Sequence, residues 1–440
     1  MGGIGYLLVW IYISGCTFIS FRMIIEKYRA QSLLRKAAPS LFSWTEMYLN
    51  PYQGCYHDCK YCDGKSEHYY MHEDYADRIK VKINAPELLE TYLKKKGFLP
   101  LHREKTSTLL DFMPSAKHSV HQPPKFILFI GGGVCDVYQP AEQEVRMTRT
   151  LLNVAHDYRF PVFILTKNDG VLEDIDLLKK INKDSYAGVS FSITLADERA
   201  QKIFEPNAST TQERFEAIRI LREEHIHSGI HFYPVLPFIG DTHENMKEIY
   251  DKGKNCGAEF IYCWGLTLKP GRSKDEFLQA VKTYYSHLLP RYATLYGNED
   301  RYGHPDPNQM QALNMVPPEV RGYILGYERG IPYCAQRYIP EGRHKTNIKI
   351  AELLQRCVFL KTIILGSSSP ATWKVHKVSQ LLEEMDREVS SPDFMDSRQL
   401  HIPGEFLPTV QEFLEEGEST SMKDLEREAY HRAVELVQHS

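Results

Sequence analysis

No surplus of charge of either sign marks this sequence. Its 440 residues contain 53 lysines and arginines against 57 aspartates and glutamates, which gives a formal net charge of -4. A protein that attracts nucleic acid through its overall field needs a clear basic excess, so this composition excludes that mode of binding. A local basic groove is still compatible with it.

Cysteines are scattered, and their number is odd. There are nine in the chain, and only Cys55, Cys59 and Cys62 lie close together in the sequence. A disulfide framework is typical of short secreted domains with paired cysteines. The pattern therefore argues against a disulfide-stapled fold and favours reducing, cytoplasmic surroundings.

One long apolar run lies near the N-terminus. Residues 4–21, IGYLLVWIYISGCTFISF, contain no charge and are about long enough to span a bilayer. No Lys or Arg precedes the run, which fits poorly with a secretory signal. Residues 1–22 could be a membrane anchor that leaves the rest of the chain on the cytoplasmic side, or a buried helix. They could also be no part of the natural protein, since Met23 offers an in-frame start, and we favour this third interpretation.

From residue 48 onward, short β-rich runs alternate with helical patterns six times. The expected strands are residues 47–52, 125–133, 161–168, 187–194, 229–237 and 258–266. The expected helices are residues 84–97, 140–158, 171–181, 211–224, 242–255 and 273–288. Serial βα units imply a parallel sheet with right-handed crossovers. Six units instead of eight predict an α/β fold with an open, partial (β/α)6 TIM-like barrel.

The pattern changes beyond residue 290, where turn-rich segments and amphipathic helices follow one another. We expect a lead-in segment at residues 23–47, the barrel at 48–290 and a mainly helical C-terminal extension at 291–440. That extension could cover the barrel mouth. Residues 98–124 are polar and predict a surface loop, and no internal repeat of solenoid period is present.

Polar and Gly/Pro-rich segments follow the C-terminal ends of the expected strands, where a βα barrel builds its site. The first of these, NPYQGCYHDCKYCDG at residues 50–64, carries three cysteines in C-x3-C-x2-C spacing. Structural metal sites and ordinary iron–sulfur clusters are held by four protein ligands. Three thiolates leave one iron of a four-iron cube open to a chelating molecule. The alternative is a zinc site, with His57, His68 or His72 as the fourth ligand.

The same motif, with Tyr61 directly before the last cysteine, resembles the signature of the radical S-adenosylmethionine (SAM) enzymes. Further segments resemble the spore photoproduct lyase-like group of that superfamily, in the order GGGVCDVYQPAEQE, ILTKN, VSFSIT, FEPNAS and PVLPFIGD. The resemblance covers roughly residues 25 to 290. It implies a partial βα barrel, a [4Fe–4S] cluster and SAM as cofactors.

Carried onto this sequence, the resemblance implies that Cys55, Cys59 and Cys62 ligate the cluster. The implied cofactor-binding residues are Tyr61, Gly131, Gly132, Gly133, Lys167 and Ser192. Tyr61 would lie near the nucleoside, the glycines near the methionine part, the lysine at its carboxylate, and the serine would hydrogen-bond the cofactor. SAM would be cleaved reductively to a 5′-deoxyadenosyl radical that abstracts hydrogen from a substrate. A flavodoxin or ferredoxin would supply the electron.

The sequence does not identify the substrate. In spore photoproduct lyase a cysteine directly after the second strand returns a hydrogen atom to the product. Gly133 occupies that position here, and Cys135, two residues later, is the candidate hydrogen donor. We expect a lyase-like enzyme that acts on a nucleic-acid lesion or modified base. The alternatives are a peptide or small-metabolite substrate, or a non-catalytic iron–sulfur or zinc-binding module; a membrane partner is expected only if residues 1–22 are real.

Overall fold

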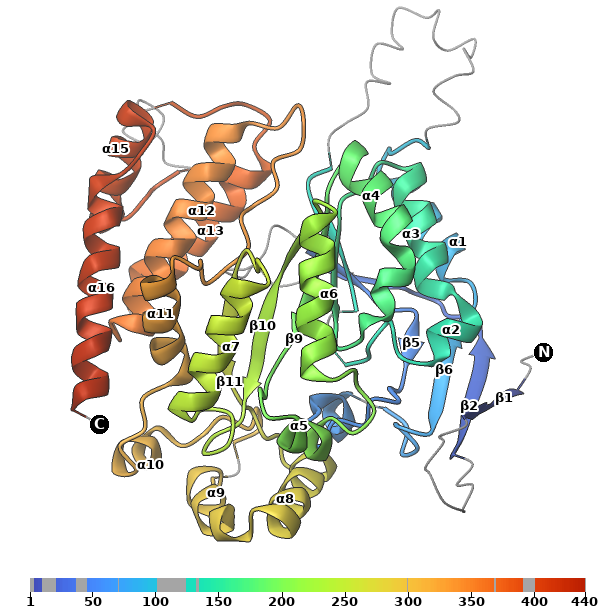
Figure 1. Ribbon diagram of the computed structural model, residues 1–440. Helices are drawn as coiled ribbons and strands as arrows, with labels where there is room; N and C mark the ends of the chain where they lie inside the picture. The colour runs from blue at the N-terminus through green and yellow to red at the C-terminus, as the bar shows by residue number, and fades with distance from the viewer. Residues whose placement is uncertain are drawn as a thin grey trace, which may run out of the picture.

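The computed structural model describes residues 4–9, 21–36, 46–69, 71–100, 124–131, 134–298, 300–367, 369–390 and 400–439. A seven-stranded sheet has the strand order β11-β10-β9-β8-β7-β4-β3 (Figure 1). Its six parallel strands are β4 (Glu46–Leu49), β7 (Ile127–Ile130), β8 (Val162–Thr166), β9 (Ala187–Ser192), β10 (His227–Val235) and β11 (Ile261–Gly265). They follow chain order, which confirms the predicted partial (β/α)6 barrel. Strand β3 (Leu34–Lys36) adds an antiparallel edge.

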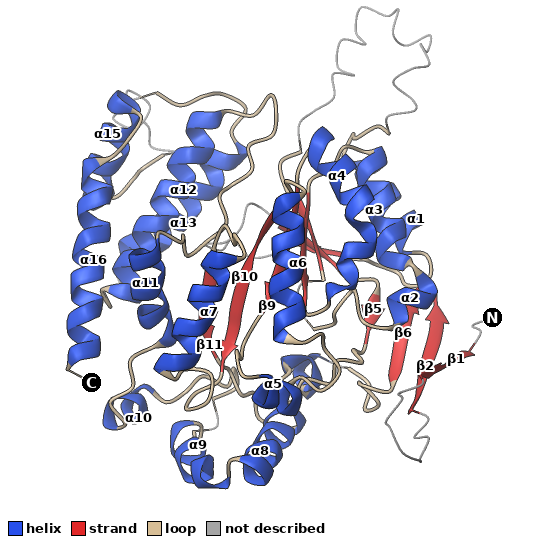
Figure 2. Cartoon of the chain, in the orientation of Figure 1, coloured by secondary structure: helices blue, strands red, loops and turns tan. Residues whose placement is uncertain are grey.

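Helices cover one face of this sheet (Figure 2). They are α1 (Ala85–Lys95), α3 (Met147–Asp157), α4 (Ile175–Asp184), α6 (Thr211–Glu223) and α7 (His243–Asn255). The strand residues that face them, such as Ile130, Ile164 and Val189, are fully buried in one continuous core. On the other face Ile127, Phe129 and Phe163 are also buried, so the parallel strands are apolar on both faces because both are covered.

The helix expected at residues 140–158 is divided in two. A short helix α2 (Ala141–Val145) ends at Arg146, whose φ of 54° is left-handed, and α3 starts at the next residue. The Glu142 carboxylate accepts hydrogen bonds from the backbone N–H groups of Thr148 and Arg149, at 2.9 and 3.2 Å. This side chain caps the start of α3, so the break satisfies backbone donors that a continuous helix would pair internally.

A second, smaller sheet was not predicted. It has the order β1-β2-β6-β5, from β1 (Ile4–Val9), β2 (Phe21–Tyr28), β6 (Arg78–Lys82) and β5 (Tyr52–Gln53). The sequence RIKVK of β6 alternates buried apolar and partly exposed charged side chains, as a strand with one covered face requires. Because β5 leads directly into the cysteine segment, this sheet fixes where that segment begins.

The structure corrects one interpretation of the apolar N-terminal run. Its first residues form the strand β1, which pairs with β2, and not a buried helix. Residues 10–20 lie outside the described part of the chain. Among the helices that are described, none combines the length and apolar character needed to cross a bilayer. The anchor and leader interpretations of residues 1–22 stay predictions, as do the domain boundaries at 23–47, 48–290 and 291–440.

The C-terminal part is helical, as expected, but most of it lies elsewhere than over the barrel mouth. Its later helices are α11 (Pro318–Arg329), α12 (Lys345–Phe359), α13 (Pro370–Glu384), α15 (Leu407–Glu416) and α16 (Thr420–Gln438), which share a core of their own. The N–H of Ile261 donates to the Pro332 carbonyl, and the Lys125 ammonium lies 2.6 Å from Asp386. These contacts are at the N-terminal ends of the strands, opposite the mouth.

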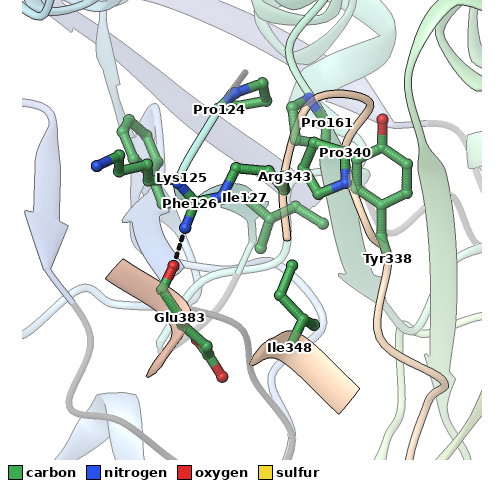
Figure 3. Close-up of a pocket in the computed structure, with 10 residues that line it drawn as sticks. All are labelled: Pro124, Lys125, Phe126, Ile127, Pro161, Tyr338, Pro340, Arg343, Ile348 and Glu383. Atoms are coloured by element: carbon green, nitrogen blue, oxygen red, sulfur yellow. Dashed lines mark hydrogen bonds between the residues drawn. The ribbon is translucent and has the colours of Figure 1, made fainter. Parts of the chain in front are cut away.

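Figure 3 shows this junction in detail. Pro161, which precedes β8, lies near Pro340 and Tyr338, and Lys125, which precedes β7, also lines the junction. Arg343 donates a hydrogen bond to the Glu383 carbonyl. The space left between them is only about 30 Å³. At the starts of β7 and β8 the extension is therefore packed tightly against the barrel.

The mouth is bordered by a different group of helices, seen in the lower part of Figure 1. These are α5 (Glu198–Phe204), α8 (Arg272–Tyr284), α9 (Leu289–Leu295) and α10 (Pro307–Ala312). They share a buried apolar cluster with Cys59 and Tyr61 of the cysteine segment. This packing holds the cysteine segment at the C-terminal ends of the strands.

Candidate active site

The three cysteines lie on one loop that follows β5. Cys55 and Cys59 are buried, Cys62 is partly buried, and none is in a disulfide. The Cys55 N–H donates to the Tyr75 carbonyl at 2.9 Å, and the Ser273 hydroxyl donates to the Cys62 carbonyl at 3.0 Å. The loop is thus held at both ends by segments that are distant in the sequence.

Two amides fix the middle of the loop. The Gln139 side chain donates to the Gly54 carbonyl at 3.0 Å and accepts from the Tyr56 N–H at 2.9 Å. The Asn207 side chain donates to the Tyr56 carbonyl at 2.8 Å. Gln139 belongs to the DVYQPAEQE segment after β7, and Asn207 to the FEPNAS segment after β9. Both segments therefore help to hold the cysteine loop in place.

The donor set suits an iron–sulfur cluster. Burial raises the pKa of the Cys55 thiol, and it raises that of Cys59 to about 12 although Lys167 lowers it. A thiol must lose its proton to bind metal, and a bound metal supplies the positive charge that makes this possible in a buried site. Within the described residues, no three His, Cys, Asp or Glu side chains already surround a single-ion position. Three thiols that bind different corners of a cube are necessarily spread more widely than the ligands of one ion.

Among the histidines considered as a fourth zinc ligand, His57 is turned toward a carboxylate. Its Nδ1 lies 3.4 Å from Oδ2 of the buried Asp136. That carboxylate also accepts hydrogen bonds from the Thr166 hydroxyl and the Lys167 N–H, both at 2.7 Å. Burial alone would raise the pKa of Asp136, but His57, the Tyr138 N–H and the Thr166 hydroxyl lower it to about 2. Asp136 thereby joins the end of β7 to the end of β8.

A second carboxylate, that of the buried Glu205, contacts three side chains from different elements. One of its oxygens, Oε1, accepts a hydrogen bond from the Tyr61 hydroxyl and lies 3.8 Å from the Lys167 ammonium. The other, Oε2, accepts from Arg214 at 2.5 Å. We call these four residues the Glu205 cluster. Burial would raise the pKa of Glu205, but Arg214, Lys167 and Tyr61 lower it to about 2.

Two of the predicted cofactor-binding residues, Tyr61 and Lys167, belong to this cluster, and the Lys167 ammonium lies 5.6 Å from the centre of the Tyr61 ring. A third, Ser192, is buried at the end of β9, and its carbonyl accepts from Arg214 at 2.7 Å. The structure therefore gathers these three residues at adjoining strand ends. Their roles toward a cofactor stay predictions.

The other predicted residues have the following places. Gly131 has a φ of +87°, and a Cβ there would approach the Leu165 carbonyl to 2.7 Å, so the close packing of β7 and β8 needs glycine. Gly132 and Gly133 lie outside the described residues. Cys135 is buried, and burial together with the nearby Cys62 thiol raises its pKa to about 12. Its role as hydrogen donor stays a prediction.

On the other side of Cys62 lies a separate polar group, the Asp63 cluster of Asp63, Thr267 and Lys269. The Lys269 ammonium binds the Asp63 carboxylate and lies 5.2 Å from the centre of the Tyr69 ring. The Thr267 hydroxyl is 3.5 Å from the same carboxylate oxygen. Tyr61 and Asp63, which flank Cys62, thus anchor the loop in two different networks.

Sequence reasoning did not assign roles to Asp136, Gln139, Glu205, Asn207 and Arg214. Four of these residues stand in the segments quoted for the family resemblance, DVYQP and FEPN. Their position in these segments could have identified them as candidate functional residues. What the sequence alone does not reveal is that the polar side chains turn inward, because polar residues in turn segments are mostly exposed.

A cavity of about 1230 Å³ lies far from these residues, at the N-terminal ends of β9, β10 and β11. Six of its lining side chains form the pairs Arg356–Glu426, Lys349–Glu352 and His227–Glu259. No cysteine of the loop reaches it. Its size alone does not make it the reactive site, because the chemistry-bearing residues meet at the opposite edge of the sheet.

Inside the barrel, His231 on β10 is buried beside Ser190, with 2.6 Å between Nδ1 and the hydroxyl oxygen. Burial and the positive charge of Lys167 lower the pKa of His231 from 6.5 to about 3. The folded protein therefore keeps this imidazole neutral at pH values where the unfolded chain has already taken up a proton. Stability should consequently fall as the pH drops below 6.5, until the folded pKa is reached.

From pH 7.5 to 5.5 this residue alone should lower the free energy of unfolding by about 1.4 kcal/mol. His231→Phe should remove that share of the pH dependence, since phenylalanine does not titrate and suits the surrounding Phe163, Phe260 and Tyr262 rings. Urea unfolding of both proteins at the two pH values measures the difference. Equal pH slopes would contradict a neutral His231.

Comparison with known proteins adds a family assignment for part of the chain. Residues 49–252 match the model of the radical SAM superfamily. An uncharacterized protein of Mycobacterium tuberculosis is 24% identical over 318 residues, which are 71% of this chain and 84% of that protein. An uncharacterized protein of Methanocaldococcus jannaschii is 25% identical over 243 residues, or 55% of this chain and 78% of that protein.

Among solved structures, spore photoproduct lyase in complex with dinucleoside spore photoproduct superposes with a TM-score of 0.46 at 14% identity. The match covers 70% of this chain and 80% of that chain. The cobalamin-dependent radical SAM enzyme OxsB with aqua-cobalamin bound gives a TM-score of 0.34 at 10% identity. There the match covers 89% of this chain and 55% of the other.

Proposed function

Residues 49–252 form a domain of the radical SAM superfamily, whose enzymes use a [4Fe–4S] cluster and SAM, and we propose that Cys55, Cys59 and Cys62 ligate that cluster here. The observation that carries the proposal is the loop itself. Its three free cysteines lie at the C-terminal ends of the parallel strands, held by hydrogen bonds from the segments around Tyr75, Gln139, Asn207 and Ser273. Three thiolates leave one iron for SAM.

The chain's own residues would then bind and orient the cofactor. The Lys167 ammonium, beside the loop, suits the carboxylate of a bound amino acid, and the Ser192 hydroxyl suits a polar group next to it. The apolar inner face, with Phe129, Phe163 and Phe260, would keep water from the reaction. When bound, cluster and SAM together supply a 5′-deoxyadenosyl radical that abstracts hydrogen from the substrate.

For the substrate, we favour a nucleic-acid lesion or a modified base. The segments DVYQPAEQE, VSFSIT and FEPNAS, which resemble the spore photoproduct lyase-like group, support this choice. The absence of a basic surplus favours the second candidate, a peptide or a small metabolite. The reaction needs one electron from outside the chain, for which a flavodoxin or ferredoxin is the expected partner.

The function is tested by incubating oxygen-free, cluster-reconstituted protein with SAM and dithionite. We expect 5′-deoxyadenosine and methionine to form in equal amounts, and only when both reagents are present. Mass spectrometry measures both products. Protein that carries a full complement of iron but forms no 5′-deoxyadenosine would contradict the proposed cleavage.

A further inference from the structure

We propose that Glu205 is a positioning residue that sets the Lys167 ammonium and the Tyr61 hydroxyl in place for an anionic ligand group. The inference rests on the proposed function, in which that group belongs to the bound cofactor. Glu205 would itself make no contact with the ligand. It would act through the two side chains that its carboxylate holds.

The main observation is that the two carboxylate oxygens of Glu205 have different partners. Oε2 receives Arg214, while Oε1 receives the Tyr61 hydroxyl and lies 3.8 Å from Lys167. If Glu205 served only to neutralise the buried guanidinium, Oε2 would suffice. Oε1 instead contacts Tyr61 of the cysteine loop and Lys167 beside it.

The carboxylate is also held in one orientation. Glu205 and Arg214 are both fully buried. Arg214 donates to the Ser192 carbonyl at 2.7 Å and, through Nε, to the Ser209 carbonyl at 2.9 Å. Because the guanidinium is fixed by two backbone oxygens, it fixes Oε2, and Oε1 can then point only toward Tyr61 and Lys167. The Glu205–Arg214 pair therefore fixes the position of Lys167 relative to β9 and α6.

The balance of charge shows what the cluster would receive. Its ionisable groups are two cations, Lys167 and Arg214, and one anion, Glu205, with Tyr61 neutral beside them. Arg214 is matched by Glu205, so Lys167 is the cation in excess, and 14% of its side chain is exposed. A partly buried ammonium held beside a cysteine loop suits one carboxylate of a ligand.

The first test uses the metal-free chain and needs no activity. Glu205→Gln keeps the shape of the side chain but removes the charge that holds Lys167. Acylation by an amine-reactive ester, mapped by mass spectrometry, should become about threefold to tenfold faster at Lys167, as expected for the loss of one ion pair. Unchanged labelling of Lys167 would overturn the proposal.

The chain offers a matched control for that test. Lys269 is 13% exposed and has its own carboxylate partner, Asp63, on the far side of Cys62. Glu205→Gln should leave the labelling of Lys269 unchanged, whereas Asp63→Asn should accelerate Lys269 and leave Lys167 unchanged. Acceleration of both lysines by either variant would indicate general loosening and would also overturn the proposal.

The second test separates this proposal from the function on which it rests. In reconstituted protein, Glu205→Gln should weaken SAM binding, measured by calorimetry, about tenfold at unchanged iron content. If the unaltered protein binds no SAM, the proposed function fails, while the labelling test still decides the role of Glu205. If both proteins bind SAM equally well, the positioning role fails and the function stands.

The single variant leaves Arg214 without a charged partner and could fail to fold. The double variant Glu205→Gln/Arg214→Met then replaces it, because it removes both buried charges together. The same acceleration at Lys167, with Lys269 as the internal reference, is expected. A double variant that folds and labels like the unaltered chain would overturn the proposal.

Discussion

Replacing any one of Cys55, Cys59 and Cys62 by alanine is expected to lower SAM cleavage by at least about 100-fold, since the loss of a direct metal ligand exceeds the effect of losing an outer hydrogen-bond partner. Iron content should fall with it, because two thiolates on a short loop do not retain a four-iron cube. Iron and sulfide analysis together with 5′-deoxyadenosine formation measure the effect.

Cys334→Ala is the matched control for these variants. Cys334 is also a partly buried free thiol, but it lines the cavity at the N-terminal ends of the strands, remote from the loop. This variant should keep its iron and its cleavage rate. A variant with all three loop cysteines replaced that still cleaves SAM would refute the site.

Arg214→Met is expected to lower the free energy of unfolding by about 3–5 kcal/mol, because it leaves the Glu205 carboxylate buried without its partner. Both side chains have no exposed surface, and Arg214 also satisfies the carbonyls of Ser192 and Ser209. Urea unfolding monitored by circular dichroism measures the loss.

Adding Glu205→Gln to Arg214→Met should recover a large part of that loss, because the unpaired charge is then gone. Recovery of this kind separates an electrostatic cause from simple loss of packing. If the double variant is as unstable as the sum of the two single variants, the two side chains do not interact as the structure indicates.

The barrel was predictable because its strands are short, mostly apolar runs placed between amphipathic helices. Runs such as KFILFI and PVFILT show this pattern plainly, and the observed β7 and β8 fall inside the expected ranges. The small sheet was not predictable in the same way. Strands β2 and β6 pair across about fifty intervening residues, and nothing local in either run identifies its partner.

The location of the C-terminal extension also could not be predicted from the sequence. Its helices were expected from their periodicity, but the choice between the two ends of the barrel depends on contacts such as Ile261 with Pro332 and Lys125 with Asp386. These join residues far apart in the chain. Periodicity shows which face of a helix is apolar and does not show which surface receives it.

The cysteine loop was identifiable from spacing alone, whereas its supports were not. C-x3-C-x2-C is a local pattern, but Glu205 reaches Tyr61 across more than a hundred residues, and Gln139 reaches Gly54 across more than eighty. A buried carboxylate is recognised only when its partners are seen around it. The sequence thus predicts which cysteines ligate a cluster, and the structure adds the residues that hold their loop.

Mössbauer spectroscopy most directly tests the proposal that three cysteines ligate a cluster whose fourth iron binds SAM. The spectra are recorded on oxygen-free, iron-57 reconstituted protein before and after addition of SAM. We predict a four-iron cluster in which one iron site changes its spectrum when SAM is added, while the three thiolate-ligated sites do not. Two results would contradict this: thiols occupied by zinc, or a cluster whose four irons stay alike with SAM because a further protein thiolate, such as Cys135, completes the set.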